Sequence, residues 1–432
     1  MNLQETYKSK LVSVEEAAKK IESGDKIWCG PCTAGPLQLM DAIADRVDEL
    51  TDVEIVSGLA LYPYKLFQSP KYIGKIDYYT YFYGGYERAL FKNGNINVNS
   101  CNLSQLNRAL INVHHVKTLI SEVSEPDEEG YMYYGPVGSF VNGDVAEYAE
   151  KIIVQVNRLQ PHIHGPNNKT RIHVNDVTWI CEVEEHAMPL FPNPEVSEVE
   201  QKIANYIVEQ IPDGATIQVG IGGLANAVAY GLDSRKNLSV HSEMFTDALM
   251  YLYKKGVISG TILVAFSMGN KELYEFLHNG PVQMAPASFV NSPLEIMKCE
   301  KFVGINSCLM ADLTGQVCSE SLGHLQYSST GGQNDYAKGT SLVDEAKAFL
   351  CMASTNTAKD GTLRSTITLN LPPGAAVSVA RSDVAYVVTE YGIANIRNRS
   401  IRQRVNAMIE IAHPSFRESL RKEAIEAGLI LT

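Results

Sequence analysis

The feature that most limits the fold is an order of elements that occurs twice along the chain. Ser13 and Glu16 form a capping box, in which a Ser side chain and a Glu three residues later close the first turn of a helix. The residues that follow predict that helix, an alternating strand through Trp28, a Gly/Pro-rich turn, a second helix over 37–47 and a second strand over 53–56.

The same order starts again at residue 197. Ser197 and Glu200 form another capping box, and the segment ATIQV predicts a strand that leads into a glycine turn over 220–223. A helix from LANAVAYGL and a strand over 238–240 complete the second copy. Short strands that alternate with helices build parallel sheets with right-handed crossovers. The doubled order therefore predicts an α/β protein of two tandem, related domains with mostly parallel sheets.

A proline-rich segment separates the two copies. The segment PLFPNPEV places three prolines between residues 189 and 194. The chain has 432 residues, and about 150 residues per domain would allow two or three domains. We place the boundary in this segment, with an N-terminal domain over 1–190 and a C-terminal domain over 191–432.

Charge and cysteine content restrict the partners and the compartment. The net charge of -12 and the pI near 5.4 argue against nucleic acid or an anionic membrane as the main partner, because both attract basic surfaces. The N-terminus lacks the apolar core of a secretory signal, and the longest uncharged run contains five glycines and does not fit a membrane span. Eight scattered cysteines fit reduced thiols. We expect a cytoplasmic protein.

The string WCGPC, from Trp28 to Cys32, resembles the redox loop of thioredoxin-like proteins. A thioredoxin needs strands before the CxxC and a cis-proline loop tens of residues later, within a compact fold of about 100 residues, and this arrangement is not recognisable here. The string also occupies the same place in the first copy as GIGG does in the second. We interpret the two cysteines as small residues that pack a strand-to-helix turn.

The turn GIGG predicts a binding site for an anionic or acyl ligand. Glycines directly after a strand let the backbone turn sharply into a helix, whose free N–H groups then point at whatever binds there. Gly220, Gly222 and Ala225 also satisfy the dinucleotide pattern G-x-G-x-x-G/A, with Glu243 at the distance of a ribose-binding acid. An NAD-dependent dehydrogenase is therefore an open alternative.

Glu243 is the candidate catalytic residue. It follows the predicted strand 238–240, and the carboxyl ends of parallel strands border the ligand crevice of an open α/β sheet. A carboxylate can act as a covalent nucleophile, and neighbouring N–H groups can hold the oxyanion that forms. Together these groups suit attack on a thioester carbonyl. The alternative interpretation is a solvated carboxylate in a loop.

Five segments together resemble class I CoA transferases of the acetyl-CoA hydrolase/transferase group over nearly the whole chain. These segments are GIGG (220–223), HSEM (241–244), GGQND (331–335), VTEYGIA (388–394) and, less closely, SEPDEEGYMYYG (124–135). The resemblance is strongest to 4-hydroxybutyrate and butyrate:acetate CoA-transferases. It implies the CoA-transferase fold, which is related to NagB and RpiA.

The resemblance also implies roles for individual residues. Glu243 would form a glutamyl-CoA thioester, and Gln333 would hold the acyl or carboxylate group of the substrate. The residues that would contact CoA are Gly220, Ile221, Gly222, Gly223, Leu224, Leu309 and Gly332. Two positions depart from the pattern: Pro31 stands where some 4-hydroxybutyrate enzymes have a histidine, and Tyr336 stands where a phenylalanine is usual. Both departures concern the acyl substrate.

The expected function is transfer of CoA between a short-chain acyl-CoA and a carboxylic acid such as acetate, butyrate or 4-hydroxybutyrate. CoA is then a substrate, and we expect no tightly bound cofactor. A thioesterase, an NAD-dependent dehydrogenase and a non-catalytic CoA-binding scaffold remain as alternatives. We also expect a homodimer or a higher homo-oligomer.

Other polar features give weaker signals. The pairs His114-His115 and His162-x-His164 lack a third ligand at a recognisable spacing, so we predict no metal site. The basic run from Asn395 to Arg404 could meet CoA phosphates, but a solvated helix face is the usual meaning of such a run. We predict a solvated face.

Overall fold

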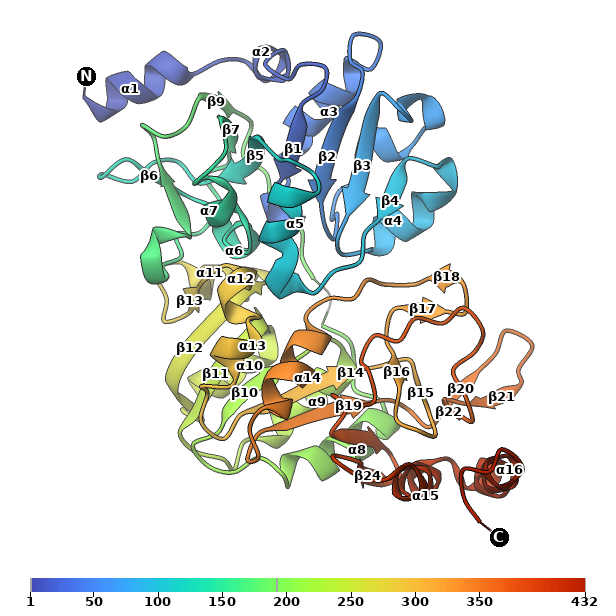
Figure 1. The fold of residues 1–432 in the computed structure, drawn as a ribbon. Coiled ribbons are helices and arrows are strands. Elements are labelled where there is room, and N and C mark those ends of the chain that lie inside the picture. Colours follow the sequence, from blue (N-terminus) through green and yellow to red (C-terminus); the bar gives the residue numbers. More distant parts are fainter. Residues whose placement is uncertain (1, 192, 432) are drawn as a thin grey trace. The chain divides into compact units, whose positions relative to one another are not determined.

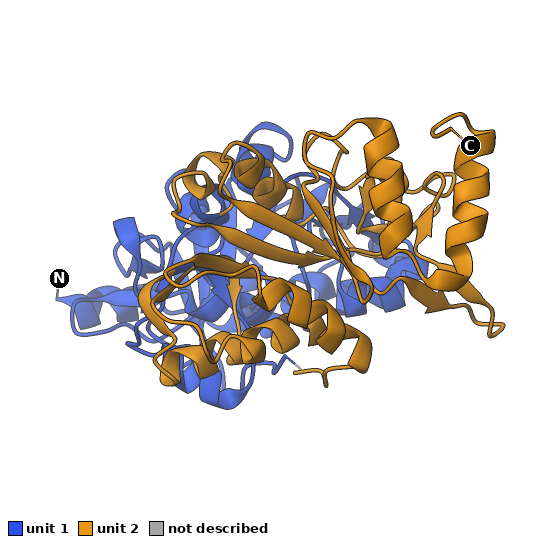
Figure 2. Ribbon diagram, turned by 90° about the horizontal axis from the view of Figure 1, so that it is seen from below, with its two compact units in different colours: residues 1–192, 263–290 blue, residues 193–262, 291–432 orange. Residues whose placement is uncertain are grey.

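The computed structural model describes residues 2–191 and 193–431, which form two compact units (Figure 2). One unit contains Met1–Pro192 and Leu263–Val290, and the other contains Asn193–Ile262 and Asn291–Thr432. The chain thus first passes from one unit to the other within the proline-rich segment. The predicted domains over 1–190 and 191–432 stay a prediction, since compactness does not test whether each part folds by itself.

The first unit is built on a seven-stranded parallel sheet (Figure 1). Its order is β4 (Ile96–Val98), β3 (Ile76–Thr80), β2 (Val53–Ser57), β1 (Lys26–Cys29), β5 (Thr118–Val123), β7 (Lys151–Val156) and β9 (Trp179–Glu182). Alternate side chains of β1 pack on opposite faces, with Ile27 in one buried cluster and Trp28 in another. Burial on both faces is what a parallel sheet requires.

A second sheet has eight strands. Its order is β13 (Gln283–Met284), β12 (Ile258–Ser267), β11 (Leu238–Phe245), β10 (Thr216–Val219), β14 (Val303–Ser307), β19 (Lys347–Cys351), β23 (Tyr386–Thr389) and β24 (Gly392–Asn395). β24 pairs antiparallel with β23. The order β13-β12-β11-β10-β14-β19-β23 repeats the order of the first sheet strand for strand. The prediction of two tandem, related α/β folds with mostly parallel sheets is confirmed.

The strand registers allow single residues of the first sheet to be matched with single residues of the second sheet. Ile27 of β1 pairs with Ile55 of β2, and Ile217 of β10 pairs with Val240 of β11. When the two first strands are aligned at these isoleucines, the residue that corresponds to Glu243 is Gly58. The first unit therefore has no carboxylate at the position of the candidate nucleophile.

The helices begin where the sequence predicts, although some end earlier. Both predicted capping boxes are present: the Glu16 N–H donates to Ser13 Oγ at 3.2 Å, and the Ser197 N–H donates to Glu200 Oε2 at 2.9 Å. The first box opens only the five-residue α2, because turns follow it up to Gly24. The helices are α1 (Leu3–Lys10), α2 (Val14–Ala18), α3 (Leu37–Asp45), α4 (Gly85–Leu90), α5 (Leu106–Asn112), α6 (Gly135–Gly138), α7 (Asn142–Val145), α8 (Glu198–Val208), α9 (Gly223–Gly231), α10 (Asp247–Lys254), α11 (Lys271–Leu277), α12 (Ala287–Val290), α13 (Pro293–Ile296), α14 (Gln333–Ser341), α15 (Ile401–Ile411) and α16 (Pro414–Glu426).

Short strands lie outside the two main sheets. They are β6 (Tyr131–Tyr133) with β8 (Arg171–His173), β15 (Met310–Asp312) with β16 (Val317–Cys318) and β22 (Ile367–Thr368), β17 (Ser321–Leu322) with β18 (Leu325–Gln326), and β20 (Thr355–Thr357) with β21 (Leu363–Ser365). Among the described residues, no helix is both long and apolar enough to cross a membrane.

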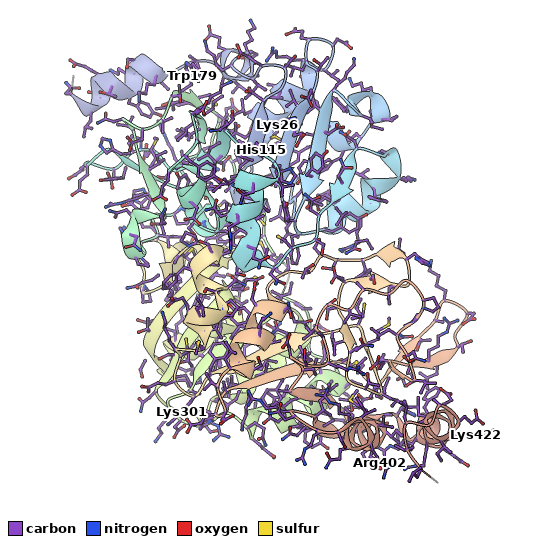
Figure 3. All side chains as sticks on the ribbon, in the orientation of Figure 1. Lys26, His115, Trp179, Lys301, Arg402 and Lys422 are labelled. Carbon is purple, nitrogen blue, oxygen red and sulfur yellow. The ribbon has the colours of Figure 1, made fainter. Side chains whose placement is uncertain are left out.

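The basic run is only partly a solvated helix face. Arg402 is exposed on α15 and is labelled among the side chains of Figure 3. Arg404 is buried instead, and Arg397 precedes the helix. The Arg397 guanidinium donates to the carbonyl oxygens of Thr340 at 2.6 Å and of Val343 at 2.9 Å, at the end of α14. Two of the arginines in this run therefore hold the fold together and are not free to meet a phosphate.

Candidate active site

Glu243 lies inside β11 and not in a loop after it. The strand continues to Phe245, five residues beyond the predicted end, and Thr246 then caps α10. The ten-residue β12 is the neighbour of β11 in the sheet and gives it a partner beyond the end of β10. Because side chains alternate along a strand, His241 and Glu243 lie on the same face of β11. The predicted strand end at residue 240 is therefore wrong, because β11 continues to Phe245.

Two donors hold the Glu243 carboxylate. Asn291 Nδ2 donates to Glu243 Oε2 at 2.8 Å, and the Gly332 backbone supplies another hydrogen bond. A Cβ on Gly332 would lie only 1.9 Å from Glu243 Oε2, so the carboxylate packs directly against the glycine backbone. The structure thus brings together Glu243 and Gly332, which the resemblance assigned to the same site.

The surroundings of Glu243 shift its protonation into the neutral range. Burial raises the pKa of Glu243 to about 7, and the negative charge of Asp335 adds to this effect. The hydrogen bonds from Asn291 and Gly332 act in the opposite direction because they favour the ionised form. Shifted carboxylates of this kind are frequent in active sites, where a basic carboxylate must still be ionised near neutral pH.

The glycine turn joins β10 to α9 as predicted. The Gly220 N–H donates to the Ile305 carbonyl at 2.9 Å, which fixes the turn to the neighbouring strand β14. Gly222 is the N-terminal cap of α9 and has a φ of 102°, a conformation that L side chains rarely adopt. Ile221 is 42% exposed and Leu224 is 5% exposed. Ile221 is therefore the member of this turn that a ligand could cover.

Gly223 has a different neighbour. A Cβ on Gly223 would lie 2.6 Å from both carboxylate oxygens of Glu200, the residue that closes the capping box of α8. The carboxylate therefore sits beside the first residue of α9. A negative charge at a helix N-terminus stabilises the helix, but it repels a second anion at the same place. This arrangement is unfavourable for the pyrophosphate of a dinucleotide, which the NAD alternative would place at this helix start.

Leu309 and Gln333 lie at the carboxyl end of β14. Leu309 is partly buried, and its N–H donates to the Cys318 carbonyl at 2.9 Å. Gln333 Nε2 donates to the Ser307 carbonyl at 2.7 Å, and Gln333 Oε1 accepts from Ser319 Oγ at 2.5 Å. The Gln333 amide thus has two protein partners and one N–H left to offer. The roles of both residues stay predictions.

Asn291 is the residue of this site that sequence reasoning missed. Its side chain is fully buried, and its Oδ1 has no hydrogen-bond partner within the described part of the chain. Asn291 follows Glu243 by 48 residues, as a single asparagine in the segment SFVNSPLE. No spacing rule connects two such positions, so only the folded structure could reveal the pair.

The first unit contains a separate buried carboxylate, Glu122, at the end of β5. Glu122 Oε1 accepts from Asn157 Nδ2 at 2.8 Å and from Gln160 Nε2 at 3.0 Å, while Oε2 accepts from Gln155 Nε2 at 2.8 Å and lies 3.0 Å from His186 Nε2. The hydrogen bond to Glu122 raises the pKa of His186. Because amides and an imidazole already fill its bonding positions, this carboxylate is a structural anchor.

The WCGPC turn does not have the features of a redox site. Cys29 and Cys32 are both free and buried, and burial raises the pKa of both thiols. Attack on a disulfide requires a thiolate of lowered pKa. Packing of the turn between β1 and α3 remains the interpretation that fits these thiols.

The histidine pairs of the sequence have ordinary partners in the first unit. His114 Nε2 lies 3.0 Å from Tyr81 Oη, and the His162 ring stacks on Tyr133 with a centroid distance of 4.3 Å. His164 Nε2 lies 2.9 Å from Asn279 Oδ1. Within residues 2–191 and 193–431, no three His, Cys, Asp or Glu side chains are placed to hold a metal ion.

Comparison with solved structures identifies the fold. The crystal structure of RipA from Yersinia pestis matches with a TM-score of 0.91 and 30% identity over 100% of both chains. A 4-hydroxybutyrate CoA-transferase from Porphyromonas gingivalis matches with a TM-score of 0.79 and 29% identity over 98% of this chain and 99% of the other. The fold is that of CoA-transferases.

Sequence comparisons extend this result to the family. The acetyl-CoA hydrolase/transferase N-terminal domain matches residues 1–192, and the C-terminal domain of the same family matches residues 269–424. The 4-hydroxybutyrate coenzyme A transferase of Clostridium kluyveri is 37% identical over 98% of this chain and 99% of its own length. The butyryl-CoA:acetate CoA-transferase of Anaerostipes caccae is 34% identical over 99% of both. The chain belongs to the acetyl-CoA hydrolase/transferase family.

Proposed function

We propose that this protein transfers CoA between a short-chain acyl-CoA and a carboxylic acid, with Glu243 as the nucleophile. One observation carries the proposal: the Glu243 carboxylate is held by Asn291 and Gly332 at the end of a parallel strand, with its pKa raised to about 7. Such a carboxylate is more basic than an ordinary glutamate and is still about half ionised at neutral pH. Acetate, butyrate and 4-hydroxybutyrate are the candidate acids, because relatives are named for them.

The reaction would proceed through two covalent intermediates. Ionised Glu243 attacks the acyl-CoA carbonyl carbon, and the C–S bond breaks. CoA departs as the thiolate, and an acyl-glutamyl anhydride forms on Glu243. The thiolate then attacks the Glu243 carboxyl carbon and releases the acyl group as a free carboxylate. The product is a glutamyl-CoA thioester. A second carboxylic acid reverses these steps and leaves as the new acyl-CoA.

The glycine turn would hold CoA and the developing oxyanion. We assign CoA contacts to Gly220 through Leu224, to Leu309 and to Gly332, and a substrate contact to Gln333. Within the turn, the Gly222 N–H is better placed than the Gly223 N–H for an oxyanion, because the Glu200 carboxylate lies beside Gly223. We further propose that the protein is cytoplasmic and assembles as a homodimer or a higher homo-oligomer.

The direct test is to trap the Glu243 thioester. The protein is incubated with acetyl-CoA, reduced with borohydride, and digested for peptide mass mapping. Reduction of Glu243, or a mass gain of CoA on its peptide, is expected. Glu243→Gln should give neither product. Glu320, another buried carboxylate, which accepts hydrogen bonds from Ser378 and Thr330, should stay unmodified. An unmodified Glu243 peptide in an active preparation would contradict the proposal.

Hydrolysis is the second candidate function, because the family includes hydrolases as well as transferases. A hydrolase would use the same intermediates with water as the acceptor. Release of free acid is measured with acetyl-CoA alone and again with butyrate present. Transfer predicts butyryl-CoA formation that greatly exceeds hydrolysis, whereas equal acid release in both reactions would favour the hydrolase.

A further inference from the structure

Tyr336 carries a buried hydroxyl without a hydrogen-bond partner in the described part of the chain. Its side chain is 1% exposed, and its hydroxyl has no hydrogen-bond partner among residues 2–191 and 193–431. Buried polar groups without partners are uncommon, and each one requires an explanation. A phenylalanine would fill the same space and leave no hydroxyl unpaired, so packing alone does not explain a tyrosine here.

The packing around Tyr336 leads to the strand that carries Glu243. The Tyr336 ring stacks on Phe302 with a centroid distance of 6.0 Å and an interplanar angle of 4°. Phe302 in turn meets His241 edge-on at 6.4 Å. His241 shares a face of β11 with Glu243, as the alternation of side chains along the strand requires. A stack of rings therefore connects Tyr336 to the face that carries the candidate nucleophile.

The helix that carries Tyr336 also touches Glu243 by a second route. Tyr336 belongs to α14, whose N-terminal cap is Gly332, and the Gly332 backbone bonds the Glu243 carboxylate. The residue before Tyr336 is Asp335, which is 1% exposed. Tyr336 is thus fixed by a ring stack on one side and by a helix start on the other.

Two carboxylates act on this hydroxyl. After burial, the charge of Glu243 and then that of Asp335 are the main causes that raise the pKa of Tyr336, followed by Cys299. The charge of Asp335 also raises the pKa of Glu243. Asn291 and Gly332 bond the Glu243 carboxylate, and His241 shares a face of β11 with it. Cys299 packs against the cluster that contains Tyr336 and Phe302. A neutral hydrogen-bond donor close to two negatively charged carboxylates stabilises their ionised forms.

We propose that Tyr336 is a positioning residue for Glu243: its hydroxyl donates a hydrogen bond to the Glu243 and Asp335 carboxylate pair when Glu243 is ionised, in the free protein as well as during turnover. The inference rests on the proposed function, in which ionised Glu243 is the nucleophile. The hydroxyl keeps Glu243 ionised and aimed, and it does not touch the substrate.

The test compares two tyrosines whose hydroxyls are equally buried and unpaired. Tyr336→Phe removes the hydroxyl on which the Glu243 charge acts. Tyr134→Phe is the matched control, because Tyr134 is 0% exposed, has an unpaired hydroxyl, and belongs to the first unit. The measured quantity is kcat/KM against pH for each full-length variant. Loss of a donor to the ionised carboxylate raises the Glu243 pKa, so the acidic limb for Tyr336→Phe should move up by about half a pH unit or more.

The expected rates follow from this shift. At pH 6, Tyr336→Phe should be at least about threefold slower than the wild type, and the two should converge above pH 8.5 or so. Tyr134→Phe should follow the wild-type profile throughout. A tyrosine analogue with a more acidic phenol, 3-fluorotyrosine at position 336, keeps the packing and should move the limb the other way. Superimposable profiles for the wild type and Tyr336→Phe would overturn the inference.

A measurement without substrate separates this inference from the proposed function. Thermal unfolding of the wild type and Tyr336→Phe is followed from pH 4 to pH 9. A raised Glu243 pKa extends to higher pH the range in which stability falls. Identical pH dependence in the two proteins would reject the role of Tyr336, even if CoA transfer is confirmed. A wild type that transfers no CoA would reject the function and leave this measurement valid.

Discussion

A methyl group on Gly332 would lie 1.9 Å from Glu243 Oε2 and 2.1 Å from Asn291 Nδ2. The Gly332 backbone therefore fixes where the carboxylate can sit, and no side chain larger than hydrogen fits between them.

Gly332→Ala should displace the Glu243 carboxylate and slow CoA transfer. Misplacing a reacting group by about 1 Å can cost on the order of a hundredfold in rate, so we expect kcat to fall by at least about tenfold. Steady-state kinetics checks this. Gly85→Ala is the control, because a Cβ there meets nothing within 4 Å. Equal activity in the two variants would show that the close contact is irrelevant to the reaction.

Asn291→Ala should shift the pH dependence of activity. Asn291 donates to the ionised carboxylate, so its removal should raise the Glu243 pKa further and move the acidic limb of kcat/KM upward by about one pH unit. Asn95→Ala is a matched control, since Asn95 is also buried, donates to the Leu66 carbonyl and has an unpaired Oδ1. A profile for Asn291→Ala that coincides with the control would contradict the assignment.

Glu243→Gln should change how stability depends on pH. The folded protein binds the Glu243 proton more tightly than the unfolded chain does, with a pKa of about 7 against 4.5. This preference stabilises the fold below pH 4.5, and the stabilisation is lost as the pH rises to 7. At pH 8 the variant should therefore be more stable than the wild type by on the order of 1 to 3 kcal/mol. Chemical unfolding at several pH values measures the difference, and parallel curves would refute it.

His186→Gln should lose stability mainly at low pH. The pKa of His186 is raised by Glu122, so the stabilisation is fully present below about pH 6.5, the unperturbed pKa, and is lost as the pH rises through the higher folded value. We expect a loss of about 1 to 3 kcal/mol at pH 6 and a smaller loss at pH 9. His164→Gln, which removes a histidine that lies 2.9 Å from the amide oxygen of Asn279, is measured in parallel for comparison. A pH-independent loss in His186→Gln would mean that the imidazole acts without its charge.

Short thioesters should react slowly as well as bind weakly. A carboxylate is a poor nucleophile, so binding energy from the pantetheine and nucleotide of CoA must be realised in the transition state. Acetyl thioesters of N-acetylcysteamine, pantetheine and CoA are compared by steady-state kinetics. We expect kcat to fall as the thiol is shortened. An unchanged kcat with a higher KM would mean that these parts serve only to bind.

The sequence was sufficient for the architecture because the repeated signals are local. The capping boxes at Ser13 and Ser197 and the glycines at 220–223 act within a few residues, and the structure reproduces them. The predicted end of β11 was wrong because the length of this strand depends on its partner β12, which sequence periodicity does not reveal. Helix ends were less accurate for the same reason.

The site was predictable only where a motif or a strand end marked it. Glu243 was predicted from its place at a strand end, and Gly332 from the resemblance that includes the segment GGQND. The structure places these two residues in contact, while their roles stay predictions. Asn291 and the Glu200 carboxylate at Gly223 could not be predicted, because both depend on contacts between distant or differently oriented segments. The unpaired hydroxyl of Tyr336 likewise requires knowledge of everything around it.

The repeated sheet order has a consequence for counting active sites. Where the second copy places Glu243, the first copy has Gly58, so doubling the scaffold did not double the reactive group. An excess of thioester should therefore attach one covalent group to each chain. With a radiolabelled substrate, the bound label should reach a plateau at one equivalent per chain, whatever the number of chains in the assembly.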